Sequence, residues 1–163
     1  MENELYSQAE ALGERLRQLG WRLALAESCT GGWLAKLVTD VPGSSDWFDR
    51  GFVTYSNQAK QEMLGVDDET LANFGAVSGE TARAMVAGAL THSGAELALA
   101  ITGIAGPGGG SIDKPVGTVW FAWGKTGSDA RAARERFEGD REAVRRQAVA
   151  FGLARLQDLV DAA

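Results

Sequence analysis

The chain has 163 residues, with 16 Lys plus Arg against 22 Asp plus Glu, so its formal net charge is −6. Apolar residues make up 45%, which is ordinary for a folded protein, and this length predicts one domain over residues 1–163. The acidic balance argues against a nucleic-acid partner. No segment has the apolar length of a membrane span, and the acidic start is unlike a secretory signal. We therefore expect a cytoplasmic protein.

Cysteine and histidine each occur once, as Cys29 and His92. One cysteine excludes an internal disulfide, and one histidine excludes a metal site that needs two. We expect no metal and no cofactor. His92 falls near the end of a predicted helix, where a histidine interacts favourably with the helix dipole. A catalytic Ser-His-Asp triad is therefore not expected.

Hydrophobic periodicity and turn residues predict helices and strands that alternate along the chain. In chain order, the first predicted elements are a helix over 4–19, a strand over 23–26, a helix over 31–38 and a strand over 48–55. Helices follow over 57–64, 67–74 and 80–90. A strand over 97–101, a β-hairpin over 116–123 and 131–137, and a helix that begins at Asp140 complete the chain. This order predicts an α/β fold, namely a three-layer α/β/α sandwich around a mixed β-sheet. Ligands of such sheets bind where strands end at their carboxyl edge.

The first candidate segment, residues 27–32 (ESCTGG), joins a buried strand to a helix. This turn would present Ser28 as a nucleophile, and Thr30, Gly31 and Gly32 would offer backbone amides to an oxyanion or another anion. A structural alternative is that Ser28 or Thr30 only caps the helix.

A serine nucleophile needs a base, and composition favours a lysine whose pKa is lowered by burial. Lys60 lies just after a strand end in the segment TYSNQAK, where Tyr55 is positioned to orient the amine or to relay a proton. The alternative is that Tyr55 is a strand-end aromatic residue and Lys60 a surface residue.

Two further segments are candidates for substrate binding. The glycine-rich residues 102–110 would let backbone amides approach a ligand, although they match no dinucleotide or triphosphate motif and also suit a long connection. Arg141 and Arg145 lie one turn apart at the start of the last helix, where helix amides and arginine together suit a monophosphate. A solvated helical face is the alternative for these arginines.

The sequence resembles the CinA C-terminal domain family, the nicotinamide-nucleotide amidases. The matching blocks are AESCTGGWLAKLVTDVPGSSDWF, RGFVTYSNQAKQEMLGV, FGAVSGETA, AITGIAGPGGGSIDKPVGTVWFAW and FEGDREAVRRQA. They cover most of residues 24–150 in the family order, and the chain resembles the stand-alone form without the N-terminal domain of longer members.

The resemblance implies hydrolysis of the carboxamide of nicotinamide mononucleotide to nicotinate mononucleotide and ammonia, as part of pyridine-nucleotide recycling. Carried over by position, it implies Ser28 as nucleophile with Lys60 and Tyr55 as catalytic partners. For substrate binding it implies the residues Thr102, Gly103, Arg141 and Arg145. It leaves Ser44 and Ser45 open as substrate-loop residues or as a rival nucleophile. In this reading, amides at residues 30–32 stabilise the tetrahedral oxygen.

Two alternatives to the serine amidase remain open at this point. The first is a non-catalytic module that binds a pyridine nucleotide or a protein partner. The second uses Cys29 as a thiolate nucleophile, because a helix start lowers a thiol pKa. A glycine-rich α/β domain of this size often pairs, so we expect a homodimer.

Overall fold

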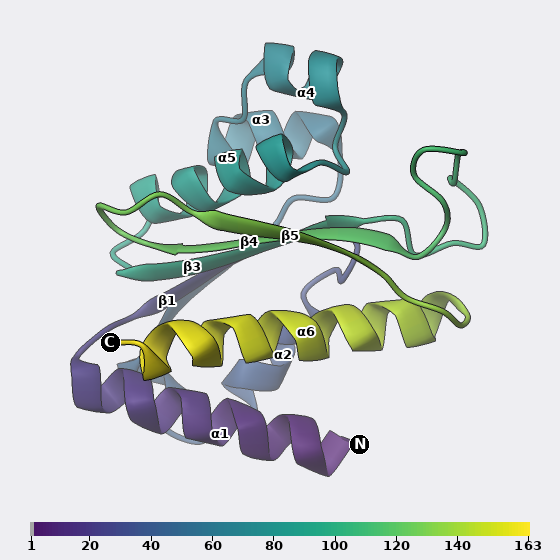
Figure 1. Ribbon diagram of the computed structural model, residues 1–163. Coiled ribbons are helices and arrows are strands. Elements are labelled where there is room, and N and C mark those ends of the chain that lie inside the picture. The colour runs from purple at the N-terminus through teal and green to yellow at the C-terminus, as the bar shows by residue number, and fades with distance from the viewer. Residues whose placement is uncertain (1) are drawn as a thin grey trace.

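A five-stranded mixed sheet forms the centre of the computed structural model, which describes residues 2–163, and helices cover both faces of the sheet (Figure 1). The elements, in chain order, are α1 (Glu2–Leu19), β1 (Leu23–Glu27), α2 (Trp33–Thr39), a 3₁₀ turn (Ser44–Asp46), β2 (Phe48–Val53), α3 (Asn57–Leu64), α4 (Asp68–Phe74), α5 (Gly79–Thr91), β3 (Leu97–Gly103), β4 (Thr118–Lys125), β5 (Arg131–Arg136) and α6 (Arg141–Asp161). The expected three-layer α/β/α sandwich is confirmed.

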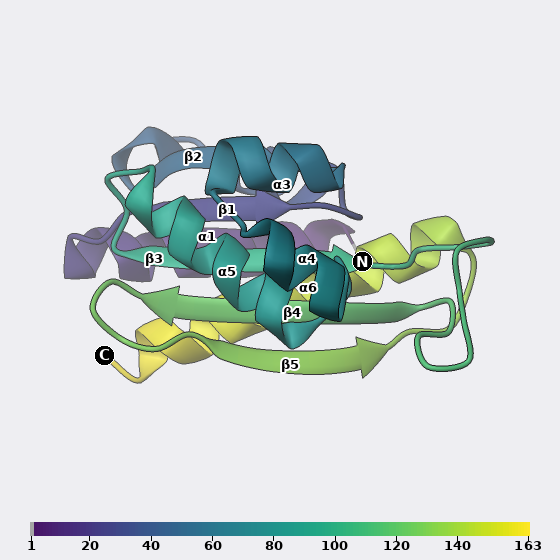
Figure 2. The same ribbon diagram turned by 90° about the horizontal axis from the view of Figure 1, so that it is seen from above.

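The strand order is β2-β1-β3-β4-β5. Strands β1, β2 and β3 run parallel, whereas β4 is antiparallel to both β3 and β5. Helices α3, α4 and α5 lie on one face of the sheet, and α1, α2 and α6 lie on the other (Figure 1). Viewed from above, α5 runs across β3 and β4 (Figure 2). No helix among residues 2–163 is both long enough and apolar enough to cross a membrane.

Strand β1 is buried on both faces because helices cover both sides of the sheet, and its residues alternate between large and small apolar side chains. Leu23 and Leu25 of β1 belong to the core shared with α1, α2 and α6. Ala24 and Ala26 of the same strand face the other core, where α5 packs. The small alanine side chains leave room for that helix to approach the sheet closely.

Parallel pairing brings three chain segments to one edge of the sheet. Glu27, the last residue of β1, is in register with Val53 on one side and Ile101 on the other. The loops that follow β1, β2 and β3 therefore begin side by side. Residues that are distant in the sequence meet at this edge, as expected for the carboxyl ends of parallel strands.

The predicted elements agree with the structure except at several ends. The first hairpin strand begins at Thr118 rather than at residue 116. Gly117 has φ +93°, its amide donates to Ile104 O at 2.8 Å, and its carbonyl accepts from Phe137 N at 2.9 Å. The second strand ends at Val53, so Tyr55 lies in a loop.

Candidate active site

Ser28 lies in the turn between β1 and α2, where the chain leaves the sheet. Its amide donates to Ile101 O of the neighbouring strand at 2.9 Å, and the residue is buried, with 7% of its surface exposed. Gly31 and Gly32 then adopt φ angles of +60° and +97°, which glycine tolerates without strain. These two glycines allow the sharp turn that directs the chain into α2.

The buried carboxylate of Glu27 stabilises this turn through hydrogen bonds. Its Oε1 accepts from Thr30 Oγ1 at 2.7 Å and from Leu34 N at 3.0 Å, and its Oε2 accepts from Ala35 N at 2.9 Å. The two amides belong to the first turn of α2, where backbone N–H groups have no partner within the helix. Thr30 is fully buried, and its hydroxyl contributes to the turn rather than to the cavity.

Lys60 reaches the turn from α3 and is buried, with only 1% of its surface exposed. Its Nζ lies 3.0 Å from Ser28 Oγ, 2.9 Å from Thr54 O and 3.1 Å from Tyr55 O. Ser56 caps α3 by accepting from Ala59 N, and this cap fixes the helix start that carries Lys60. The sequence-predicted pair Ser28 and Lys60 is thus brought into contact.

Burial lowers the pKa of Lys60 from 10.5 to about 8, because an ammonium ion loses hydration when it leaves water. None of its three hydrogen-bond partners is a carboxylate that would restore the charge. About a tenth of the amine is therefore neutral at pH 7, far more than for an unperturbed lysine. A neutral amine beside a hydroxyl can accept its proton.

Tyr55 takes part in the site mainly through its backbone. Its carbonyl accepts from Lys60 Nζ, and Ser28 Oγ lies 3.4 Å from the same oxygen. The side chain is 62% exposed, and its hydroxyl accepts from Arg141 Nη2 at 3.3 Å. Arg141 also donates from Nη1 to Gly106 O at 2.7 Å, so it links α6 to the glycine-rich loop.

Arg145 lies behind the Ser28 turn. Its Nε donates to Cys29 O at 3.0 Å and its Nη2 donates to Thr30 O at 3.2 Å. The guanidinium also lies over the ring of Trp33, 5.6 Å from the centroid, a cation–π geometry. The two arginines predicted together therefore differ in their contacts, since Arg141 reaches Tyr55 and Gly106.

An open cavity of about 240 Å³ adjoins these groups. Its lining residues are Ser28, Cys29, Tyr55, Lys60, Ala76, Val77, Thr102, Gly103, Ala105 and Arg141. The Thr102 hydroxyl donates to Ala76 O at 2.9 Å and so ties β3 to the segment before α5. The glycine-rich segment thus contributes its first residues to the cavity wall.

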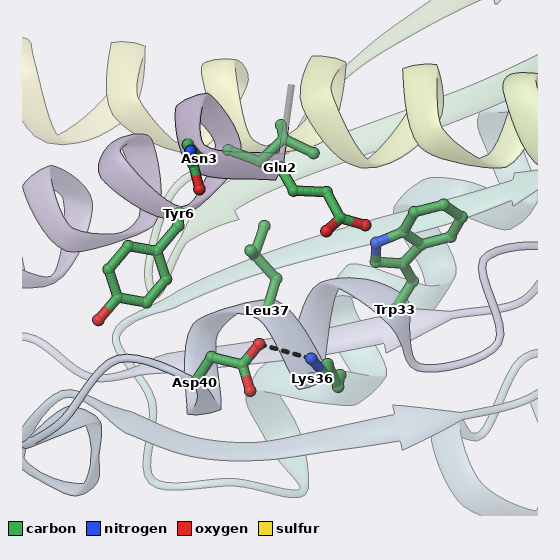
Figure 3. A pocket seen from close by; sticks show the side chains of 8 residues that line it. Glu2, Asn3, Tyr6, Trp33, Lys36, Leu37 and Asp40 are labelled. Carbon is green, nitrogen blue, oxygen red and sulfur yellow. Dashed lines mark hydrogen bonds and ion pairs between the residues drawn. The ribbon is translucent and has the colours of Figure 1, made fainter.

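A second cavity of similar size lies between α1 and α2 (Figure 3). Trp33, Tyr6 and Leu37 border it, and Lys36 forms an ion pair with Asp40 at 2.7 Å. This lysine is exposed and its pKa is raised by the hydrogen bond to Asp40. The cavity therefore offers no neutral amine beside a hydroxyl, and its chemistry differs from that of the Ser28 site.

The residues Ser45, His92 and Cys29 take no part in the Ser28–Lys60 contact. Ser45 is exposed in the 3₁₀ turn before β2, at the opposite end of the strand from Thr54, so the chain does not bring it to this cavity. His92 caps the end of α5, and its carbonyl accepts from Arg50. Cys29 lines the cavity, but burial raises the pKa of its thiol to about 11, which disfavours a thiolate nucleophile.

Sequence reasoning missed Glu27 and the paired carbonyls that hold the amine. A glutamate at the end of an otherwise apolar strand, in LALAE, was the available signal for Glu27. The carbonyls of Thr54 and Tyr55 left no such signal, because every residue carries one. Among residues 2–163, no group of three or more His, Cys, Asp or Glu side chains lies close enough to hold a metal ion.

Comparisons with known proteins identify the family to which this fold belongs. The model of the CinA C-terminal domain matches residues 5–160. The nicotinamide-nucleotide amidohydrolase PncC of Escherichia coli K12 is 54% identical over 155 residues, which are 95% of this chain and 94% of that protein. The same-named protein of Pseudomonas putida is 54% identical over 151 residues, 93% of this chain and 94% of that protein.

A crystal structure of a competence/damage-inducible protein from Agrobacterium tumefaciens superposes with a TM-score of 0.93 at 45% identity. The match covers 95% of this chain and 94% of that one. Sequence and structure therefore both place the whole described fold, including the loops that carry the cavity, within one group of proteins. The chain belongs to the CinA C-terminal domain family.

Proposed function

We propose that the chain hydrolyses the carboxamide of nicotinamide mononucleotide to nicotinate mononucleotide and ammonia, in the recycling of pyridine nucleotides. Ser28 is the nucleophile and Lys60 the base of this reaction. The observation that carries the proposal is the 3.0 Å contact between Lys60 Nζ and Ser28 Oγ in a buried site. The similar PncC proteins are named nicotinamide-nucleotide amidohydrolases, which supports the substrate.

The two carbonyls on Lys60 support its role as base. An ammonium has three donors, which suit Thr54 O, Tyr55 O and Ser28 Oγ. A neutral amine has only two N–H donors and one lone pair. When the two carbonyls take both donors, the lone pair is directed at the third neighbour, Ser28 Oγ, whose hydroxyl then donates to it.

The reaction proceeds in two stages. Lys60 Nζ takes the hydroxyl proton as Ser28 Oγ bonds to the amide carbon, and the carbonyl π electrons move to oxygen to form the tetrahedral intermediate. The Lys60 ammonium then protonates the departing nitrogen, the carbon–nitrogen bond breaks, and ammonia leaves an acyl-serine ester. Water attacks this ester with Lys60 again as base, which releases the acid and restores the Ser28 hydroxyl.

The developing oxyanion needs hydrogen-bond donors close to Ser28. The Gly31 amide donates to Ser28 O at 3.1 Å, so it is engaged within the turn. The amides of Cys29 and Thr30 make no hydrogen bond to another residue in the described part of the chain. These two amides are our candidates for the oxyanion site, an arrangement in which the residue after a nucleophile supplies a donor.

Arg141 is the candidate for the nucleotide phosphate. It lines the cavity, and it begins α6, where Asp140 caps the helix by accepting from Ala143 N at 2.9 Å. Arginine donates to phosphate through several N–H groups at once. Arg141 donates to the Tyr55 hydroxyl and to Gly106 O, and it makes no hydrogen bond to Ser28 or Lys60.

The test is ammonia release from nicotinamide mononucleotide by the purified wild-type chain and three variants. We expect Ser28→Ala and Lys60→Ala to lose activity by at least about 10³-fold, since both act in the same step. Cys29→Ala is the matched control and should retain activity. Activity in Ser28→Ala, or loss confined to Cys29→Ala, would contradict the proposal, and binding of the mononucleotide without turnover by the wild type would favour a binding module.

A further inference from the structure

The contacts of Arg145 differ from those of a residue that waits for a substrate phosphate. Its Nε and Nη2 already donate to Cys29 O and Thr30 O, and Trp33 covers the guanidinium. Arg145 is also absent from the cavity lining, which includes Arg141 one turn earlier on the same helix. Its side chain therefore acts on the backbone of the Ser28 turn.

Holding a carbonyl also fixes the direction of the amide that shares its peptide plane. In a planar trans peptide, the N–H of the next residue points opposite to the C=O. The Cys29–Thr30 and Thr30–Gly31 bonds are trans, because the cis bond of the described chain is Gly106–Pro107. With the Cys29 and Thr30 carbonyls turned toward Arg145, the N–H groups of Thr30 and Gly31 point away from it.

The direction of these amides is shown by the Gly31 N–H, which donates to Ser28 O. The Thr30 N–H points away from the same guanidinium and has no partner in the described chain. We infer that Arg145 is a positioning residue, which aims the Thr30 amide at the oxyanion that forms on Ser28. The inference rests on the proposed serine hydrolysis and assigns Arg145 a role in kcat instead of phosphate binding.

The close approach of Gly31 to the Arg145 guanidinium also supports this assignment. A Cβ placed on Gly31 would lie 3.3 Å from Arg145 Nη2, which is tighter than an ordinary carbon–nitrogen contact. A side chain there would require the guanidinium to shift by a few tenths of an ångström. The turn is therefore shaped to admit the arginine closely against its backbone.

The chain offers a matched control in Arg146, the next residue of α6. Its guanidinium also lies over Trp33, 5.6 Å from the ring centroid, and Arg146 makes no hydrogen bond to the Ser28 turn. Arg145→Met and Arg146→Met remove the same charge and a similar contact with Trp33. Only the first removes the donors to Cys29 O and Thr30 O.

The experiment measures kcat and KM for ammonia release from nicotinamide mononucleotide. We expect Arg145→Met to lower kcat about 100-fold, the loss typical when one oxyanion donor is misplaced, with KM within about threefold. Arg146→Met should resemble the wild type. An Arg145→Met variant with unchanged kcat and a KM raised tenfold or more would overturn the inference and assign Arg145 to the phosphate.

Two further measurements separate positioning from general damage to the fold. Added ethylguanidinium should restore part of the kcat of Arg145→Ala and have no effect on Arg146→Ala. If Arg145→Ala does not fold, the comparison of Arg145→Met with Arg146→Met carries the test. Failure of rescue in a folded Arg145→Ala variant would overturn the inference.

A fluorophosphonate probe makes the test independent of the substrate. The probe forms a bond between Ser28 Oγ and phosphorus as fluoride leaves, and its phosphoryl oxygen needs the same amide donors. Labelling, followed by intact mass, should be at least tenfold slower in Arg145→Met than in Arg146→Met. Equal labelling rates would overturn the positioning role, whereas labelling without ammonia release from the mononucleotide would contradict the proposed substrate alone.

Discussion

The pKa of Lys60 predicts how replacing this lysine changes stability with pH. A lysine whose pKa is lowered in the folded state binds fewer protons there than in the unfolded chain, so stability rises with pH between the two pKa values. For Lys60 these values are about 8 in the folded chain and about 10.4 in the unfolded chain. Lys60→Met removes this dependence.

The magnitude follows from the same two values. Between pH 7 and pH 9 the folded chain loses the Lys60 proton while the unfolded chain keeps it, which adds about 1.4 kcal/mol to the wild-type free energy of unfolding relative to Lys60→Met. The cavity beside Lys60 is open, and access of solvent would screen the ammonium, so this is the upper value. The variant also leaves Thr54 O without its donor, at a cost of about 1–3 kcal/mol, but this cost is the same at both pH values and cancels.

Urea unfolding of the wild type and Lys60→Met at pH 7 and pH 9 measures this difference. Lys36→Met is the control, because Lys36 is exposed and its hydrogen bond to Asp40 raises its pKa. Its proton stays bound in both states over this range, so the wild-type advantage over Lys36→Met should not change with pH. A Lys60→Met difference that changes no more than the control would refute the lowered pKa.

Three other predictions follow from the same structure. The kcat/KM of the wild type should rise about tenfold from pH 7 to pH 9, because the neutral fraction of an amine with a pKa of about 8 rises by that factor; a flat profile would exclude Lys60 as the base. Tyr55→Phe keeps the carbonyl that accepts from Lys60 and should retain kcat within about fivefold, whereas a loss above about 10²-fold would assign proton transfer to the phenol. Gly88→Ala should destabilise the chain by about 2–3 kcal/mol in urea unfolding, since its Cβ would overlap the Leu64 carbonyl, and Gly94→Ala, which has open space around it, should change stability by less than about 0.5 kcal/mol.

Local sequence determined the elements and their order. The alternation of leucine and alanine in residues 23–26 made a strand that is buried on both faces. Ser78 and Asp140 cap the helices that follow them, because their side-chain oxygens accept amides of the first turn. These interactions join residues within three or four positions of each other, so a sequence pattern is sufficient to predict them.

The sequence also carried the motif blocks that indicated Ser28 and Lys60, but it could not establish their contact. These residues are 32 positions apart, and they meet because β1 and β2 are parallel neighbours whose carboxyl ends share one edge of the sheet. The same parallel pairing separates Ser45 from them, since it precedes β2 and lies at the other edge. Strand register, which depends on tertiary pairing, decided both outcomes.

The environment of each group was likewise decided by the tertiary structure. Burial, which lowers the pKa of Lys60 and raises that of Cys29, depends on the elements packed around a side chain. Arg141 and Arg145 look equivalent in the sequence, one helical turn apart, yet one lines the cavity and the other donates to Cys29 O, 116 positions away. Sequence spacing placed both arginines at the start of one helix, and only the packing of that helix against the Ser28 turn separated their roles.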